Sequence, residues 1–280
     1  MISSLQKFIE NLNKSYFFLK FKIYLKVYGF GNFFNNKPIG TQEDYIKLYN
    51  QGLNSQLIIK EFINNNFSKE EQEFINELAL QTQITIKNSK LNFNHGFLIY
   101  HHLKNYLLKH KPNKIVILET GTARGFSAII MSYLLSKFNI EYNIHTIDII
   151  PHNKKIYWNC ISDHTIGKIS RSELLKDYKK YTSPITFHQG ISRDVLKKLK
   201  LDRINFAFLD GSHEYRDVKI EYEYLNSKNL SGDNIFIDDF TPNQFNGVVK
   251  CVNEIKNQSI YDVKIFNSNK ERGYAFLEKK

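Results

Sequence analysis

The stretch that decides the fold is Ile115-Val116-Ile117-Leu118-Glu119-Thr120-Gly121-Thr122-Ala123-Arg124-Gly125. Its four aliphatic residues, 115–118, predict a short buried strand. The two glycines then allow the backbone to turn tightly into a helix. The helix is indicated by an apolar stripe at helical spacing: Phe126, Ile129, Ile130, Tyr133, Leu134 and Phe138. A strand, a glycine turn and an amphipathic helix form the first unit of an alternating α/β fold.

The alternation of short apolar runs and helical stretches continues to the end of the chain. Further strands are expected at 144–147, 185–187, 204–209 and 235–237, and a hairpin at 263–266 and 274–277. We therefore predict an α/β fold with a doubly wound, Rossmann-like sheet. Its seven strands are mostly parallel and end in an antiparallel hairpin.

The pattern before Asn92 is helical throughout. Helices are expected there near 42–50, 54–64 and 69–83, and capping boxes mark two of the starts, at Thr41 and Ser68. A further helix near 96–108 leads into the rest of the chain. We predict an N-terminal helical accessory segment over 1–91 and the main domain over 92–280. Within that domain, 149–184 is long for a crossover. Its Trp158 is expected either in a substrate lid or in packing against the N-terminal helices.

Composition limits the class of protein. The chain has 280 residues, of which 42% are hydrophobic and 24% charged, so a disordered chain is not expected. Two cysteines, Cys160 and Cys251, exclude a disulfide framework. Neither a signal peptide nor an apolar run of membrane-spanning length stands out, so we expect a cytoplasmic protein. The net charge of +11 leaves a solvated basic surface, an acidic substrate, a membrane and nucleic acid as alternatives.

The first 30 residues interleave aromatic residues with lysines, most densely over 16–28. A basic amphipathic helix of this kind can lie on an anionic membrane. It can equally pack on its own domain or on a second copy of the chain. We expect packing and a homo-oligomer, and peripheral membrane contact through 1–30 stays open.

Acidic residues follow four of the predicted strands. Glu119 ends the first, Asp148 the second, Asp210 the fourth, and Asp238 with Asp239 the fifth. Ligands of doubly wound sheets bind at these carboxyl ends. Clustered carboxylates repel one another unless a cationic ligand, a lysine or a metal ion lies between them. Mg²⁺ prefers oxygen ligands, so Asp210, Asp238 and Asp239 are candidate metal ligands.

The loop after the first strand departs from a dinucleotide fingerprint, because position 123 is Ala where the fingerprint has Gly. Asp148 is placed to accept hydrogen bonds from both hydroxyls of a ribose. After the third strand, Ser192 is expected either to cap a helix or to contact an adenine edge.

These strand ends resemble those of the class I S-adenosylmethionine-dependent methyltransferases. The motifs are Leu118-Glu119-Thr120-Gly121 through Gly125, then Phe208-Leu209-Asp210-Gly211-Ser212-His213-Glu214-Tyr215, then Ile237-Asp238-Asp239. They are most similar to the small-molecule O-methyltransferases grouped with macrocin O-methyltransferase and the cephalosporin hydroxylase-like proteins. The resemblance covers 92–280.

The resemblance implies S-adenosyl-L-methionine as cofactor. Glu119 and Gly121 would lie near the methionine part, Asp148 on the ribose, and Ile191 and Ser192 at the adenine. Gly125 and Asp210 would also bind the cofactor. It also implies Mg²⁺ at Asp210, Asp238 and Asp239, as in the metal-dependent members.

The expected reaction is methyl transfer to a hydroxyl of a small molecule or sugar, including a glycoconjugate. Asp210 and His213 are the expected catalytic residues. Some relatives have an acidic base where this chain has Ser212, so His213 is the available base; its alternative role is structural, at a helix start. A nucleic-acid-directed methyltransferase and a non-catalytic binding or membrane-surface module are the alternatives. No nucleic-acid partner is expected, since the loop 238–242 lacks the motif that grips a flipped base.

Overall fold

The computed structural model describes residues 37–87, 91, 93–267 and 272–280. The basic-aromatic segment expected within 1–30 lies outside this part of the chain. A seven-stranded sheet with the order β3-β2-β1-β4-β5-β7-β6 forms the centre. Its strands are β1 Lys114–Thr120, β2 Glu141–Asp148, β3 Ile185–Gln189, β4 Phe206–Leu209, β5 Asn234–Ile237, β6 Tyr261–Asn267 and β7 Gly273–Lys279. The first five pair in parallel, and β7 runs antiparallel to both β5 and β6, which confirms the predicted doubly wound fold and hairpin.

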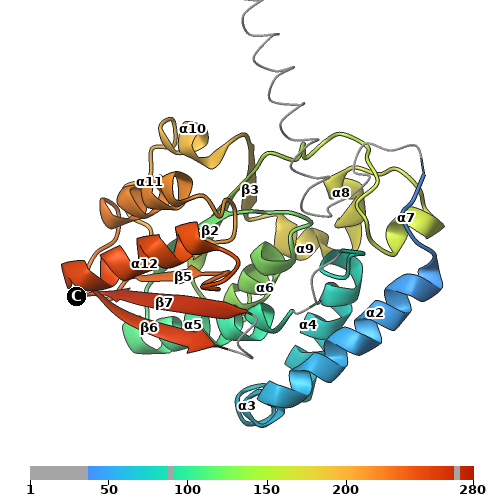
Figure 1. Ribbon diagram of the computed structural model, residues 1–280, viewed down its shortest axis with the longest axis horizontal. Helices are drawn as coiled ribbons and strands as arrows, with labels where there is room; N and C mark the ends of the chain where they lie inside the picture. Colours follow the sequence, from blue (N-terminus) through green and yellow to red (C-terminus); the bar gives the residue numbers. More distant parts are fainter. Residues whose placement is uncertain (1–36, 88–90, 92, 268–271) are drawn as a thin grey trace, which may run out of the picture.

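Helices cover both faces of this sheet (Figure 1). The larger ones are α2 Gln42–Ser55, α3 Lys60–Asn66, α4 Lys69–Thr82, α5 Asn94–His110, α6 Phe126–Leu135, α10 Ser192–Leu196, α11 Tyr215–Asn226 and α12 Asn246–Gln258. The predicted helix 54–64 is wrong in detail, because α2 continues to Ser55 and a 3₁₀ turn precedes α3. The capping boxes at Thr41 and Ser68 are present as expected.

Two apolar clusters fill the space between helices and sheet. One holds buried residues of α5 and α6, and it continues without a break into the N-terminal helices through Tyr45, Ile75 and Leu78. The other holds buried residues of α11 and α12. The described part of the N-terminal helical segment therefore shares its core with the sheet.

The crossover 149–184 folds into the short helices α7 Ser162–Thr165, α8 Arg171–Leu174 and α9 Lys179–Thr182, with a 3₁₀ turn at Lys176–Tyr178. Trp158 is fully buried there, and its indole N–H donates to the carbonyl of Ile169 at 2.8 Å. Asn159 ties the crossover to the N-terminal helices: its side chain accepts from the Tyr45 hydroxyl at 3.1 Å and pairs with both backbone groups of Ile86. Trp158 is thus packed inside the crossover, and the neighbouring Asn159 makes the contact with the N-terminal helices.

Among the described residues, no helix combines the length and the apolar character needed to cross a membrane.

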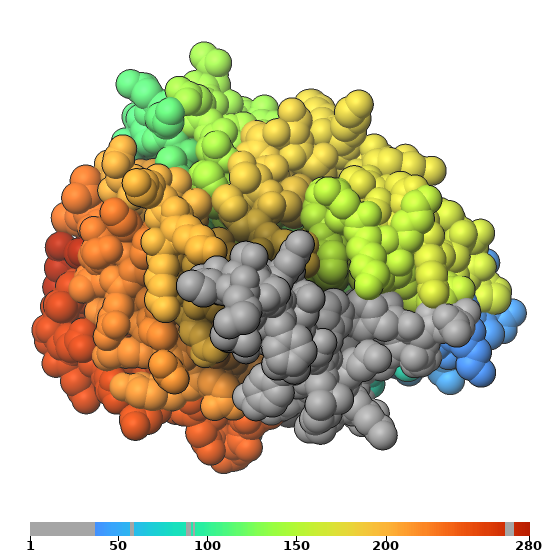
Figure 2. Space-filling model, turned by 90° about the horizontal axis from the view of Figure 1, so that it is seen from above, coloured from blue at the N-terminus to red at the C-terminus, as the bar shows by residue number. Residues whose placement is uncertain are grey.

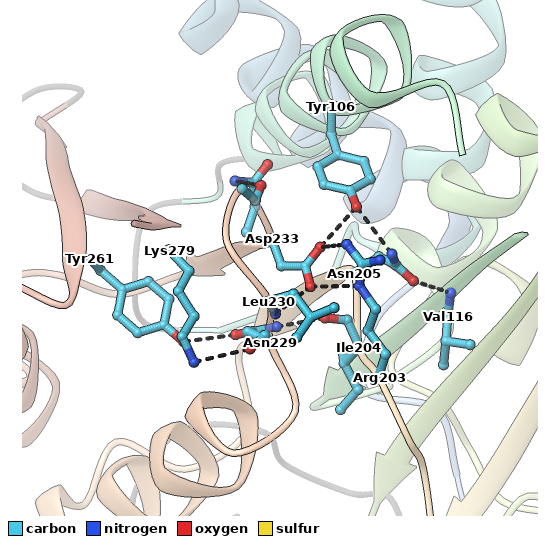
Figure 3. A network of polar contacts seen from close by, with 12 residues as sticks. Tyr106, Val116, Arg203, Ile204, Asn205, Asn229, Leu230, Asp233, Tyr261 and Lys279 are labelled. Atoms are coloured by element: carbon cyan, nitrogen blue, oxygen red, sulfur yellow. Dashed lines mark hydrogen bonds and ion pairs between the residues drawn. The ribbon is translucent and has the colours of Figure 1, made fainter. Parts of the chain in front are cut away.

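The amino ends of β4 and β5 are joined by a buried polar network (Figure 3). Asp233 is fully buried and accepts from both sides of the Arg203 guanidinium at 2.8 and 2.9 Å. It also accepts from the Tyr106 hydroxyl at 2.9 Å and the Leu230 N–H at 2.7 Å. Tyr106 receives a bond from Asn205, so helix α5 is fastened to this edge of the sheet.

We expect Asp233→Ala to lower the free energy of unfolding by about 3 kcal/mol, the lower end of the range for breaking a buried ion pair, since Arg203 keeps partial contact with water. Urea unfolding measures it. The matched control is Lys114→Ala, which removes an exposed pair with Glu141 and should cost less than about 1 kcal/mol. Equal losses in the two variants would contradict this role for Asp233.

Candidate active site

The carboxyl ends of β1, β4 and β5 lie side by side because these strands are neighbours in the sheet. The turn after β1 approaches the end of β4 closely: a Cβ on Gly121 would lie 2.0 Å from the carbonyl oxygen of Asp210. Gly121 also has a φ of +91°. Only glycine fits at this junction, for reasons of backbone geometry that hold with or without a ligand.

Three carboxylates meet at this edge, as the sequence predicts. Arg272, just before β7, holds Asp238 with two hydrogen bonds, from Nε at 3.1 Å and from the neighbouring nitrogen Nη2. The same Nε lies 3.6 Å from Asp239 Oδ1. Burial raises the pKa of both Asp210 and Asp238, and Arg272 opposes this in each case. Burial also raises the pKa of Asp239, but Arg272 and His213 outweigh it and bring the pKa to about 2.

A second positive group comes from the N-terminal part of the chain. Burial lowers the pKa of Lys87 to about 8, Arg272 lowers it as well, and the three aspartates oppose the shift. The sequence predicted that something positive must lie among the carboxylates, but it did not identify Arg272 or Lys87. Arg272 belongs to a polar turn that looks like ordinary hairpin chemistry.

His213 pairs with Asp239. Its Nε2 lies 2.7 Å from Asp239 Oδ2, and its ring stacks on Phe245 with centroids 4.1 Å apart. The His213 side chain is 22% exposed, so it reaches the surface of the site. An aspartate that holds an imidazole in this way fixes the orientation of the ring, as in known general-base pairs.

The candidate metal ligands separate into two groups. Asp210, His213 and Asp239 have ligand atoms that all lie within 4.8 Å of one another. Asp238 is bound by Arg272 instead. The structure thus brings Asp210 and Asp239 together as predicted, and adds His213 where the sequence indicated Asp238.

Glu119 lies in the core beneath the glycine loop. Its carboxylate accepts hydrogen bonds from the hydroxyls of Ser127 and Thr146. It is fully buried, and burial raises its pKa to about 7.

Asp148 lies at the end of β2, facing the same loop. Its oxygens accept from the N–H of Ala123 at 2.5 Å and the N–H of Ile150 at 2.7 Å. Burial raises its pKa, and the nearby Arg171 opposes the shift. Each oxygen keeps a lone pair for a further donor.

The structure does not show Ser192 as a helix cap. Helix α10 begins at Ser192 with Ile191 as N-cap, and no side chain caps it. The Ser192 hydroxyl lies near Glu221 and lowers the pKa of that carboxyl, which accepts a hydrogen bond from Thr120 at 3.1 Å. Glu221 is buried, and burial raises its pKa to about 7. Sequence analysis missed it, since a glutamate within an amphipathic helix gives no sign of burial.

The space-filling view shows the crossover (yellow-green to yellow) and the region of α10 and α11 (orange) on different sides of one face of the molecule (Figure 2).

The strand order, the glycine loop and the acidic strand ends together define the fold of the class I methyltransferases. Residues 118–240 match a family model described as a methyltransferase domain. No curated protein matches the sequence. Residues 118–240 thus match a methyltransferase domain, and the fold around them is the one that the strand-end motifs predicted.

Solved structures with this fold include O-methyltransferases. One is TomG from Streptomyces achromogenes, involved in tomaymycin synthesis and solved with S-adenosylmethionine; identity is 13%, the match covers 76% of this chain and 91% of that one, and the TM-score is 0.52. Another is an O-methyltransferase from Bacillus cereus solved with S-adenosylhomocysteine, with 12% identity, coverage of 79% and 97%, and a TM-score of 0.52. At this identity the likeness concerns the fold.

We expect Gly121→Ala to destabilise the protein more than Gly125→Ala. Both residues have positive φ, but the new Cβ at 121 meets backbone, whereas at 125 it meets the end of the Leu175 side chain at 3.0 Å. The left-handed conformation alone costs about 1–2 kcal/mol for an L-residue, so Gly125→Ala should lose roughly that amount and Gly121→Ala clearly more. Thermal unfolding of the two variants checks the order, and a reversed order would contradict it.

We expect Glu119→Gln to flatten the dependence of stability on pH. The pKa of Glu119 is raised to about 7 from an ordinary value of 4.5, so the folded protein binds the proton more tightly than the unfolded chain does. Its contribution is therefore lost as pH rises from about 4.5 to about 7. Urea unfolding at pH 5, 6, 7 and 8 should show a steeper fall for the original chain than for Glu119→Gln. Parallel curves would mean that Glu119 has an ordinary pKa.

Proposed function

We propose that this protein transfers a methyl group from S-adenosylmethionine to a hydroxyl of a small molecule, with the His213–Asp239 pair as general base. The observation that carries the proposal is the convergence of Asp210, His213 and Asp239 at the carboxyl edge of a domain that matches methyltransferases. His213 offers a proton acceptor there, and Asp239 orients it.

The residues at the carboxyl ends of the strands fit S-adenosylmethionine, the proposed methyl donor. Asp148 keeps lone pairs for the ribose hydroxyls, and Ile191 and Ser192 begin α10 beside it. The aspartates at this edge already attract Arg272 and Lys87, and such a group of carboxyls suits a further cationic group. When bound, S-adenosylmethionine supplies a methyl group on a sulfonium for a single in-line displacement.

The chain has two tasks in such a reaction. It must align donor and acceptor at about 3–3.5 Å, and alignment of this kind is worth roughly 7–11 kcal/mol. It must also take the proton of the acceptor hydroxyl. His213 is suited to the second task because its ring is held by Asp239 and stacked on Phe245, and yet reaches the surface of the site.

The acceptor class rests on the resemblance and on structures with the same fold. TomG is involved in the synthesis of a small molecule, tomaymycin. A sugar or glycoconjugate hydroxyl is our proposed acceptor, and the crossover 149–184 is the proposed wall of its site. No specific observation favours a nucleic acid as acceptor.

Mg²⁺ assistance belongs to the proposal as well, with Asp210, Asp239 and His213 as the fitting ligands. Asp239 belongs both to this ligand set and to the pair with His213, so metal binding and the base role would share its carboxylate. Arg272 and Lys87 already neutralise part of the acidic charge.

Calorimetry with S-adenosylhomocysteine tests the cofactor, and release of S-adenosylhomocysteine with a panel of hydroxylated small molecules and sugars tests the reaction. No cofactor binding would overturn the proposal. Methylation of RNA with no small-molecule turnover would establish the alternative function.

We expect His213→Ala to lower kcat by at least about 100-fold, the lower range for loss of a general base, while cofactor affinity stays within a few-fold. Asp239→Asn should lower kcat less, since it removes only the orienting charge. The control is Tyr222→Phe, on the far side of α11, which should leave kcat unchanged. Near-normal kcat in His213→Ala, together with complete loss of activity in a chelator, would assign activation of the acceptor to a metal.

A further inference from the structure

Arg171 is a buried arginine that lies against the glycine loop and that sequence analysis did not single out. It starts helix α8 in the crossover 149–184, and it is only 2% exposed. Its guanidinium lies between two aromatic rings, 5.2 Å from the centroid of Trp158 and 5.8 Å from that of Phe187. Burying an arginine so deeply is costly unless its donors are satisfied.

The donors of Arg171 are directed at the two residues that hold Asp148. Nε donates to the carbonyl of Ala123 at 2.9 Å, and Nη2 donates to the carbonyl of Ile150 at 3.3 Å. The N–H groups of the same two residues donate to the Asp148 carboxylate. Nη2 also lies 3.8 Å from Asp148 Oδ2. One side chain therefore closes a ring of contacts around the carboxylate.

The backbone of Ala123 shows what this ring of contacts does for the glycine loop. Its φ is +45°, in the left-handed region that L-residues avoid at a cost of about 1–2 kcal/mol. The conformation directs the Ala123 N–H to Asp148 and the Ala123 carbonyl to Arg171. The contacts with both side chains stabilise a backbone geometry that alanine does not favour by itself.

We propose that Arg171 is a positioning residue for the cofactor site: it holds the glycine loop and the Asp148 carboxylate in the geometry that binds the ribose, and so couples the crossover 149–184 to cofactor affinity. The inference rests on the proposed function, because it takes Asp148 as the ribose acceptor. The crossover 149–184 would then contribute to cofactor binding through Arg171, in addition to any contact with the acceptor.

Charge adds a second effect. Asp148 accepts from two hydroxyls more strongly when it is ionised, and its surroundings contain Arg171, Arg124 and the carboxyl of Glu119. Burial raises the pKa of Asp148, and both arginines oppose the shift. Removing Arg171 should therefore raise the pKa of Asp148 further. As the solution is acidified, the variant should then lose cofactor affinity at a higher pH than the original chain does.

The test is a double-mutant cycle of Arg171→Met and Asp148→Asn, with S-adenosylhomocysteine affinity measured by calorimetry between pH 6 and 8. Residues in one hydrogen-bond network couple strongly, so we expect Arg171→Met to weaken binding about tenfold. The double variant should bind no more weakly than Asp148→Asn alone. Arg171→Lys should restore the pH profile through its charge but only part of the affinity, since lysine lacks the fork that reaches both carbonyls.

The matched control is Arg203→Met, which also breaks a buried pair but lies at the opposite edge of the sheet. It should lower the melting temperature and leave affinity unchanged. Additive losses in the cycle, or an equal loss of affinity in Arg203→Met, would overturn the positioning role and reduce Arg171 to a stabilising residue. A chain that binds no S-adenosylhomocysteine in its original form would instead refute the proposed function itself.

Discussion

The site depends on the ion pair between Arg272 and Asp238. Two adjacent aspartates follow β5, and the burial of Asp238 would be unfavourable without a partner. The sheet topology provides the partner: β7 is antiparallel to β5, so the start of β7 lies at the carboxyl end of β5. The N–H of Phe240 donates to the carbonyl of Gly273 at 2.9 Å, which fixes Arg272 beside the acidic residues. Because β7 is antiparallel, its first residues and Arg272 lie at the edge formed by the carboxyl ends of the parallel strands. A parallel strand in the same position would have its carboxyl end there instead.

The sequence allowed much of this architecture to be predicted, for identifiable reasons. The strands of the domain are short apolar runs separated by clear turns, and the glycines of the loop at 121–125 mark the first turn directly. The helix expected at 54–64 was predicted less well, because a 3₁₀ turn over Gln56–Ile59 separates the end of α2 from the start of α3. The helix caps at Thr41 and Ser68 were predicted correctly, because a hydroxyl and an acid stand three residues apart at both starts.

The finer assignments at the site required the strand order and the register. Arg272 and Asp238 are 34 positions apart, and only the β5–β7 pairing shows that they touch. Strand β5 ends at Ile237, and Asp239 has a φ of +58°, so the alternation of side chains along a strand does not extend to Asp239. This turn lets Asp239 pair with His213 while Arg272 holds Asp238, and nothing in the sequence indicated it.

The chain completes this edge with residues outside the segment that matches a methyltransferase domain. Arg272 and Lys87 both lie beyond 118–240, and together they supply the positive charge around the three aspartates. The neighbouring residue, Ile86, fixes the position of Lys87. The Asn159 side-chain amide accepts a hydrogen bond from the Ile86 N–H and donates one to the Ile86 carbonyl. Asn159 belongs to the crossover 149–184, which also supplies Arg171. The crossover therefore reaches the edge from two sides, through Ile86 to the acidic residues and through Arg171 to Asp148. A change in its packing would alter the charge balance at one end of the site and the geometry of the glycine loop at the other.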